Sequence, residues 1–278
     1  MRRWGTRALV AGVAAAAVVA GSTAASAATA DTWTFGEVAP GDPVPPSQAF
    51  LGDVPLYAAT TTTLRAVAHG DGTALDFAAW RSLPAKAKVN KFASELSSDE
   101  SFQTDPYWGV DGGDDSFDPG TGDFSVSVWL QPTPAPDFPR GGLSPDKVSP
   151  NVLQKGRANA PGGYWKVYLQ MVKVGTTLQW APVCVLKGGD GRSANVGKRA
   201  QVLPIDNGVG VTVTCARTAG ILTLTVTPDG GDPQVRTRNA STIDVANNEA
   251  LSVGHKPGAT NASDVYDGLL ADLSVSMG

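Results

Sequence analysis

Paired carboxyl groups would be the clearest sign of chemistry, because glycoside hydrolysis uses two of them about 5–10 Å apart. On a β-strand this separation requires Asp or Glu at positions i and i+2 or i+4 of one face. The densest acidic run, residues 95–100 (ELSSDE), has neither this spacing nor an alternating apolar context. We therefore expect no catalytic carboxyl pair and assign no catalytic residue.

The histidines and the glycine-rich segments show no catalytic pattern either. His69 and His255 lie in turns that contain glycine or proline, and no Gly-x-Ser-x-Gly nucleophile motif is present. Residues 187–198 (KGGDGRSANVGK) lack the Gly-Lys-Ser/Thr sequence of a phosphate-binding loop. We expect residues 187–198 to form a flexible loop between two strands.

An acidic loop is the best candidate for binding a metal. The oxygen ligands that calcium prefers could come from Asp111, Asp114, Asp115, Asp118 and Asp123. The loop is not an EF-hand, because Pro119 stands where that motif needs glycine. A solvated loop with an Asp-Pro-Gly turn is the alternative. Calcium is therefore the one cofactor left open, with no residue assigned as a metal ligand.

The N-terminal segment has the three parts of an export signal. A basic start precedes an apolar run, Ala8–Ala20, which is too short to cross a bilayer, and the small residues 25–27 (ASA) form a cleavage site. We predict that residues 1–27 are a cleaved signal peptide, that residues 28–278 form a single domain, and that the protein is secreted and extracellular. The Arg2-Arg3 pair leaves the twin-arginine route open beside general export.

The charge of the mature chain excludes two classes of partner. Removal of residues 1–27 leaves 19 basic and 26 acidic residues, a net charge of −7. Nucleic acids and anionic membrane surfaces require a basic face, so neither is expected as a partner. No later apolar run is long enough for membrane insertion, and we expect a monomer.

Two cysteines have positions that predict a disulfide bond. Cys215 lies in phase with three preceding valines, and Cys184 lies in phase with Trp180 and Leu186. Residues at i and i+2 share a strand face, so both thiols are expected to point into the core from neighbouring strands. A structural disulfide is the usual state of such a pair in an exported protein.

Alternation with a period of two dominates the rest of the chain. The clearest strands are expected at residues 124–131, 163–174 and 177–188 and in a hairpin over 209–231. Further strands are expected at residues 31–38, 61–80, 151–156, 249–254 and 266–277, a proline-rich loop or edge at 39–48, and one short helix at 86–100. This pattern predicts an all-β fold in which two antiparallel sheets form a sandwich or jelly roll.

The order of these segments resembles a known family. The stretches DPGTGDFSVSVWLQP, NVLQKG, GYWKVYL, the cysteine hairpin, ALSVGHKP and YDGLLADLSVSM are similar to the laminin-G-like (LamG) jelly roll of the concanavalin A-like lectin/glucanase superfamily, in its secreted, single-disulfide actinobacterial form. The resemblance covers the chain from about Asp118 to the end and is fainter over residues 31–80. The stretch before Cys215 departs from it by lacking a Trp-His pair. The resemblance implies a concanavalin A-like fold, but this architecture carries lectins, adhesion modules, glycosidases and lyases alike.

The same resemblance implies what a lyase site would contain: Tyr or His, with Arg and with Gln or Asn, on the concave strands. Tyr168 and Gln170 match in part. Apolar residues flank Tyr168, however, and no histidine lies near it in the sequence. We therefore expect no lyase activity.

Trp129 lies on the polar face of its predicted strand, between Ser127 and Gln131. The resemblance implies that the first and last strands pair and that long loops cover the sheets. We expect Trp129 to pack beneath residues 33–37 or the proline-rich stretch, or to lie on the concave sheet. Stacking against a ligand is the alternative.

Three functions stay open. The favoured hypothesis is a secreted non-catalytic binding module for carbohydrate, such as a cell-wall or plant polysaccharide or a surface glycan. The alternatives are a structural or protein-interaction domain at the cell surface, and a polysaccharide lyase or glycosidase. Because flat aromatic rings stack on sugars, Tyr107 and Trp108, which we expect in a loop, are the candidate ligand-binding residues. Packing against the strands is nevertheless the favoured role for both, and ligand binding is the one to be tested.

Overall fold

A computed structural model describes residues 29–33, 35–36, 38–43, 49–50, 56–58, 64–78, 108–110, 117–135, 149–158, 161–247, 249, 251–254 and 266–278. Several predictions fall outside these residues: the signal peptide, the helix at 86–100, Tyr107, His255, and the acidic residues Asp111, Asp114 and Asp115. No helix among the described residues is both long enough and apolar enough to span a membrane.

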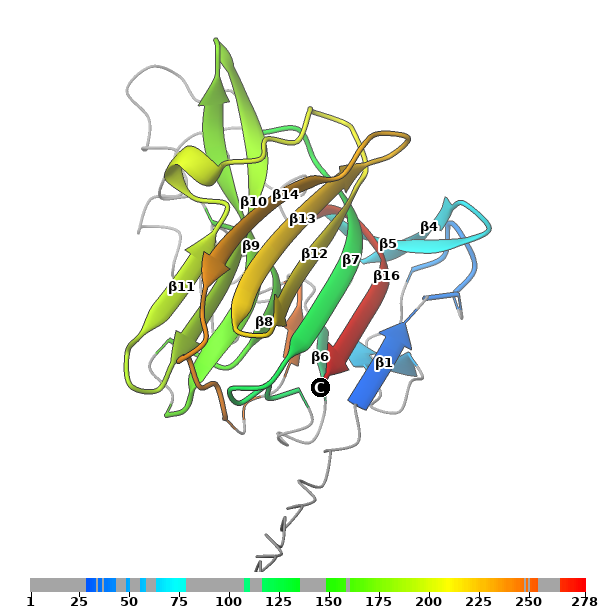
Figure 1. The fold of residues 1–278 in the computed structure, drawn as a ribbon. Helices are drawn as coiled ribbons and strands as arrows, with labels where there is room; N and C mark the ends of the chain where they lie inside the picture. Colours follow the sequence, from blue (N-terminus) through cyan, green and yellow to red (C-terminus); the bar gives the residue numbers. More distant parts are fainter. Residues whose placement is uncertain are drawn as a thin grey trace, which may run out of the picture.

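Two antiparallel sheets make up the described part of the chain (Figure 1). The first sheet has the order β14 (Gln234–Asn239), β13 (Ile221–Pro228), β12 (Val211–Thr218), β7 (Phe124–Pro132), β16 (Asp267–Met277), β5 (Gly72–Ala78) and β4 (Arg65–His69), with β1 (Thr29–Trp33) also paired to β16. The second has the order β11 (Ser193–Val196), β10 (Thr177–Gly188), β9 (Gly163–Val174), β8 (Asn151–Lys155), β15 (Leu251–Val253), β6 (Trp108–Val110), β3 (Leu56–Ala58) and β2 (Ala49–Phe50). This confirms the predicted all-β fold, a sandwich of two antiparallel sheets.

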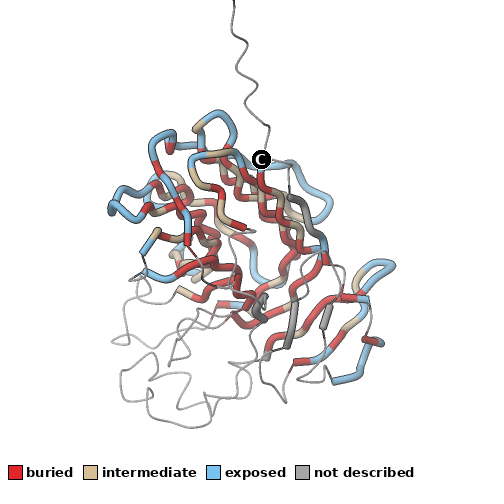
Figure 2. The backbone as a smooth tube through the Cα atoms, turned by 90° about the horizontal axis from the view of Figure 1, so that it is seen from below, coloured by how far each residue is buried: buried red, intermediate tan, exposed pale blue. Residues whose placement is uncertain are grey.

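The core lies between the two sheets because every second residue of each long strand is apolar. In β7 the buried positions begin at Phe124 and continue through Val126 and Val128. Across the core, the rings of Phe124 and Trp165 on β9 stack with their centroids 6.0 Å apart. Buried residues follow the interior of the sandwich, whereas exposed residues gather in the turns (Figure 2). The burial of alternate apolar side chains is thus what holds the sheets face to face.

The predicted disulfide between Cys184 and Cys215 is confirmed, and both residues are fully buried. The expectation that they lie on neighbouring strands is wrong. Cys184 is on β10 of the second sheet, whereas Cys215 is on β12 of the first, so the bond crosses the core. Alternation predicts that a cysteine side chain faces the core. The second cysteine can then lie on a neighbouring strand of the same sheet or on the facing sheet.

Two predicted loops contain strands. Residues 187–198, expected as a flexible loop, include β11, which pairs with the end of β10 and buries Ala194 and Val196. Trp108, expected in a loop, begins β6, which pairs with both β15 and β3. The sequence pattern also missed β14, because nearly all of its residues are exposed and charged or polar.

Trp129 is covered by packing, and its described neighbours come from a hairpin that was not among the segments expected. Its ring is 7% exposed and packs with Ala74 and Ala271, beneath the β4–β5 hairpin. The ring of His69, in that hairpin, has its centroid 3.8 Å from the Trp129 ring, and the indole N–H donates to Asp229 at 2.9 Å. The predicted pairing of the first and last strands is confirmed for β1 and β16.

Candidate functional site

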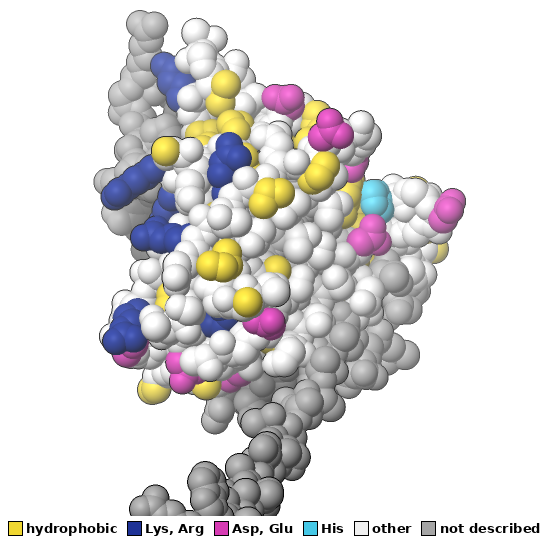
Figure 3. Space-filling model, viewed as in Figure 1, with side chains coloured by type: hydrophobic (Ala, Val, Ile, Leu, Met, Phe, Trp, Pro, Cys, Tyr) yellow, Lys and Arg dark blue, Asp and Glu magenta, His cyan; other side chains and the backbone are white. Residues whose placement is uncertain are grey.

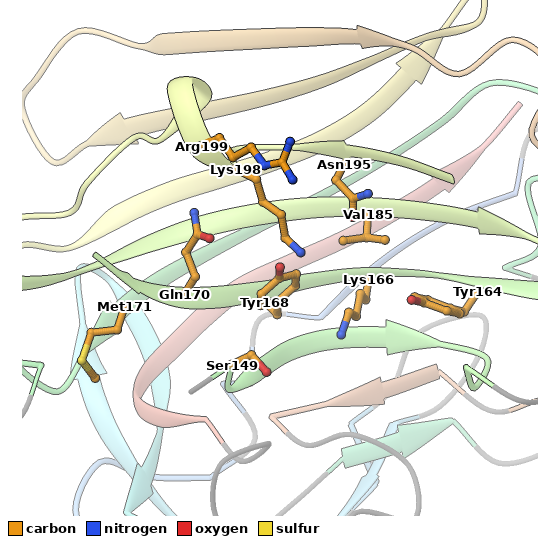
Figure 4. Close-up of a pocket in the computed structure, with 10 residues that line it drawn as sticks. All are labelled: Ser149, Tyr164, Lys166, Tyr168, Gln170, Met171, Val185, Asn195, Lys198 and Arg199. Atoms are coloured by element: carbon orange, nitrogen blue, oxygen red, sulfur yellow. The ribbon is translucent and has the colours of Figure 1, made fainter. Parts of the chain in front are cut away.

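A groove with a volume of about 510 Å³ lies on the outer face of the second sheet (Figure 4). Strand β9 supplies most of its floor, because the alternation that buries Trp165, Val167 and Leu169 turns the residues between them outward. The lining residues are Ser149, Tyr164, Lys166, Tyr168, Gln170, Met171, Val185, Asn195, Lys198 and Arg199. Aromatic, amide and cationic side chains are therefore gathered on one rigid sheet.

The two tyrosine rings of the groove have ammonium groups close to them. The Nζ of Lys166 is 4.5 Å from the ring centroid of Tyr168 and 5.9 Å from that of Tyr164. The Nζ of Lys198 is 5.4 Å from the centroid of the Tyr168 ring, and Figure 4 shows this side chain extending towards it. The Nζ of Lys187 is 5.8 Å from the Tyr164 ring centroid. Cations at these distances are attracted to the ring faces and hold a positive potential over the floor.

Burial keeps both phenols protonated to a higher pH than an exposed tyrosine. It raises the pKa of Tyr168 to about 12. The pKa of Tyr164 is raised as well, mainly by burial, with the charge of Lys198 acting in the opposite direction. A phenol is already neutral at neutral pH, and burial extends this state to higher pH, so each hydroxyl group can donate a hydrogen bond as well as accept one.

The turn after β11 brings two cations over the floor. Gly197 has a φ of +99°, and a Cβ there would lie 2.3 Å from the backbone oxygen of Pro182, so only glycine allows this close approach to β10. The carbonyl oxygen of Gly197 also accepts a hydrogen bond from the amide of Gln170 at 2.7 Å. Lys198 and Arg199 follow directly, the latter opening the 3-10 helix η4 (Arg199–Gln201).

A buried amide lies next to the groove in the strand register. Asn151 on β8 pairs with Tyr168 on β9, and its side chain is fully buried. Within the described part of the chain, neither its Oδ1 nor its Nδ2 has a hydrogen-bond partner, and the Oε1 of the nearby Gln154 has none. Polar atoms left unpaired inside a protein cost free energy, so these amides need a partner such as water or a ligand.

Of the two residues predicted to bind a ligand, the structure describes only Trp108, and only by its backbone. Tyr107 lies outside the described residues. Trp108 is described by its backbone, which pairs with Ala58 of β3 and Val253 of β15 in the middle of the second sheet. Both therefore stay candidates from the sequence alone.

The two described carboxylates of the predicted calcium loop have protein partners. Asp118 accepts a hydrogen bond from the backbone N–H of Asn247, and its Oδ1 lies 3.4 Å from the Nζ of buried Lys155. Asp123 accepts a hydrogen bond from the backbone N–H of Ala219 at 2.9 Å. Among the residues that the structure describes, no cluster of three or more His, Cys, Asp or Glu side chains could hold a metal ion. Calcium binding by this loop stays a prediction.

Sequence reasoning considered Tyr168 and Gln170 but set Tyr168 aside because its neighbours are apolar. Those neighbours point to the opposite face of the strand, so they say nothing about the surroundings of the ring. Lys198 and Arg199 were missed because they belong to the stretch expected to be a flexible loop. The floor of the groove could have been predicted from the alternating polar and aromatic residues Tyr164, Lys166, Tyr168 and Gln170, which share one face of their strand. Among the described residues that line the groove there is no histidine.

No family model matches the chain, and no curated protein matches its sequence. Among solved structures, the chain is similar to the enzymatically active domain of tailspike protein 2 of bacteriophage CBA120, with 13% identity, coverage of 80% of this chain and 28% of that chain, and a TM-score of 0.51. Domain 4 of AbnA, a GH43 extracellular arabinanase from Geobacillus stearothermophilus, has 11% identity, coverage of 81% and 82%, and a TM-score of 0.43. The receptor-binding domain of botulinum neurotoxin type G has 7% identity, coverage of 88% and 46%, and a TM-score of 0.48. The chain thus spans little more than a quarter of the tailspike chain, and the likeness to it shows a shared jelly-roll-like β-sandwich fold.

Proposed function

We propose that this chain is a secreted carbohydrate-binding module of the laminin-G-like type, and that its ligand lies in the groove over β9, β10 and β11. The observation that carries the proposal is the pair of outward-facing rings, Tyr164 and Tyr168, set among side chains that donate and accept hydrogen bonds. A sugar ring presents apolar C–H groups on its faces and hydroxyl groups at its rim. A site with aromatic rings and convergent polar groups matches both.

The size and rigidity of the groove support this proposal. Its volume of about 510 Å³ falls within the usual range for small-molecule sites and could hold two or three sugar rings. Its floor consists of paired strands, which hold side chains more precisely than loops do. The disulfide between Cys184 and Cys215 suits an oxidising compartment, as expected for an extracellular protein whose partner is a cell-wall or plant polysaccharide.

The test is binding of the mature chain to a panel of immobilised and soluble polysaccharides, with Tyr164→Ala as the groove variant. A stacked ring contributes about 0.5–1.5 kcal/mol, so this variant should weaken binding about 2- to 12-fold at an unchanged melting temperature. Trp108→Ala, in the same assay, tests the aromatic residue that the sequence alone suggested. If no polysaccharide binds, the proposal is wrong and a structural or protein-interaction role becomes the better account.

A second function, a polysaccharide lyase, is favoured by one observation. Tyr168, Gln170 and Arg199, residue types that the family resemblance implies for such a site, line the same groove. When a uronate chain is cleaved by elimination, the proton on C5 of the uronate is removed, the C4–O bond breaks and a C4=C5 double bond forms. The neutral phenol of Tyr168 could protonate the departing glycosidic oxygen, with water as the base that takes the C5 proton. The measurement is absorbance near 235 nm, where unsaturated products absorb, for wild type and Tyr168→Phe. Turnover by wild type that the variant loses would establish the lyase; no absorbance change on any uronate polymer would exclude it.

A further inference from the structure

The groove carries positive charge without acidic lining. Lys166, Lys198 and Arg199 line it, and none of the described lining residues is Asp or Glu. The whole chain nevertheless has a net charge of −4. Most of the Lys and Arg side chains visible in Figure 3 lie on the left-hand side of that view, where Figure 1 places β11 and β14, and most Asp and Glu side chains lie elsewhere. A basic site on an acidic protein attracts anions that the rest of the surface repels.

Two of the lining cations have no carboxylate partner in the part of the chain that the structure describes, whereas three basic residues outside the groove are paired with one. Lys155 is paired with Asp118, Arg157 with Glu249 at 2.9 Å, and Arg192 with Asp190 at 3.3 Å. Lys198 and Arg199, by contrast, form no ion pair with any carboxylate among the described residues. Their charges are therefore left for a ligand.

The backbone of Arg199 supports a role for its side chain. Arg199 has a φ of +54°, in the left-handed region that disfavours residues with a Cβ. Glycine would adopt this conformation without that cost, and a residue that only continued the chain would gain nothing from being arginine. Non-glycine residues in this conformation cluster at functional sites, so the left-handed backbone of Arg199 is consistent with a binding role for its side chain.

The basic surface continues beyond the groove. Arg236 and Arg238 lie on β14, the edge strand of the first sheet, and the Nη1 of Arg238 lies 3.4 Å from the backbone oxygen of Asn195, a lining residue. Neither arginine forms an ion pair with a carboxylate in the described ranges. A ligand longer than the groove would meet these two cations in succession.

We infer that the groove selects an acidic polysaccharide, in which carboxylate or sulfate groups on the sugars pair with Lys198 and Arg199 while the more exposed ring of Tyr164 contacts the sugar rings. This inference rests on the carbohydrate-binding function proposed above and specifies its ligand class. A guanidinium group binds carboxylate and sulfate through two parallel hydrogen bonds, and Lys198 adds a point charge beside it. A neutral polysaccharide would leave both cations without a counter-charge.

The experiment compares acidic polymers with neutral partners of the same backbone. Isothermal titration of the mature protein uses polygalacturonate against its fully methyl-esterified form, and dextran sulfate against dextran. We expect binding to at least one acidic polymer and none to its neutral partner, with affinity falling as NaCl rises. Binding to polygalacturonate alone assigns a carboxylate ligand, and binding to dextran sulfate alone assigns a sulfate ligand.

Variants that each remove one positive charge show which cations bind the acidic polymer. Lys198→Gln and Arg199→Gln should each weaken binding about tenfold, the usual worth of one charge-assisted hydrogen bond. Arg199→Gly should weaken binding equally and leave the melting temperature unchanged, because glycine relieves the left-handed strain. Lys173→Gln removes the same charge from an exposed position at the end of β9, outside the groove, and should leave affinity unchanged.

The outcomes separate this inference from the proposed function. Equal binding to a polymer and its neutral partner would overturn the acidic selectivity and leave the carbohydrate-binding function standing. Loss of affinity in Lys173→Gln as large as in Lys198→Gln would show non-specific attraction and overturn the inference. Absence of binding to all four polymers, together with the wider panel, would overturn both.

Discussion

At the scale of single residues, Tyr168 shows how burial sets the chemistry of the groove. Its side chain is 6% exposed, and burial raises its pKa to about 12, whereas a tyrosine in the unfolded chain titrates near 10. Between these values the folded protein binds one proton more than the unfolded chain. Its stability therefore falls as pH rises from about 10 to about 12, and the contribution is fully present below about 10.

We predict that Tyr168→Phe removes this pH dependence. Two pKa units correspond to about 2–3 kcal/mol of unfolding free energy, so wild type should lose roughly that much more than the variant between about pH 9 and about pH 12. Urea unfolding at several pH values measures the free energy of unfolding of both proteins. Tyr164→Phe is a second test variant and should change the slope in the same direction, because burial raises the pKa of Tyr164 as well. Parallel curves for wild type and Tyr168→Phe would contradict the prediction.

Arg217 is a second residue whose role follows from burial. It is 0% exposed, and its guanidinium donates to the backbone oxygens of Gly122 and Ile243, each at 2.6 Å, and of Gly120 at 2.8 Å. It thereby fixes the turn before β7 and the segment after β14 to β12. Burial lowers the pKa of Arg217, partly offset by the charges of Asp123 and Asp244.

We predict that Arg217→Met destabilises the protein by about 3–5 kcal/mol, because it leaves several buried carbonyl oxygens without donors. Arg217→Lys should cost less, since an ammonium group can satisfy some of the same oxygens. Denaturant unfolding of both variants measures the difference. A methionine variant as stable as the lysine variant would show that the hydrogen bonds of Arg217 contribute little.

At the scale of secondary-structure elements, one covalent bond ties the sheets together. Cys184 on β10 and Cys215 on β12 are separated by 31 residues in the chain, and their Cα atoms are 5.7 Å apart. In the unfolded chain the bond restricts a loop of that length, which stabilises the folded state by about 3–4 kcal/mol in the chain-entropy account.

We predict that replacing both cysteines with alanine lowers the free energy of unfolding by about that amount and leaves the fold intact, because the apolar core also holds the sheets together. Circular dichroism tests whether the fold is intact, and denaturant unfolding measures the free energy of unfolding. Reduced wild-type protein is the control and should match the double variant. Stability equal to that of the oxidised protein would contradict the chain-entropy account.

At the scale of the whole molecule, both sheets share one apolar core. A single cluster of buried residues includes Val126 and Leu224 of the first sheet and Val167 and Leu186 of the second. Neither sheet can bury its inner face alone. We therefore predict that residues 28–278 unfold in a single cooperative transition, with equal calorimetric and van't Hoff enthalpies. Two resolved transitions in scanning calorimetry would show independent units and contradict this prediction.

The strands and their buried faces could be predicted from the sequence because alternation is a local property. A strand turns successive side chains to opposite faces, so the apolar positions of residues 163–174 and 177–188 mark both the strand and its inner side. The same alternation predicted that Cys184 and Cys215 face the core and that they form a disulfide bond. These features need no information about other segments of the chain.

The neighbours of each strand were decided only by the tertiary structure. Alternation fixes a face but neither the partner strand nor the sheet, so the disulfide could be predicted while its passage across the core could not. The cover over Trp129 comes from a hairpin some 60 residues earlier in the chain. The groove combines β9 with the segment after β11, and only strand pairing brings Tyr168 beside Lys198, because the contact depends on register and on the turn at Gly197.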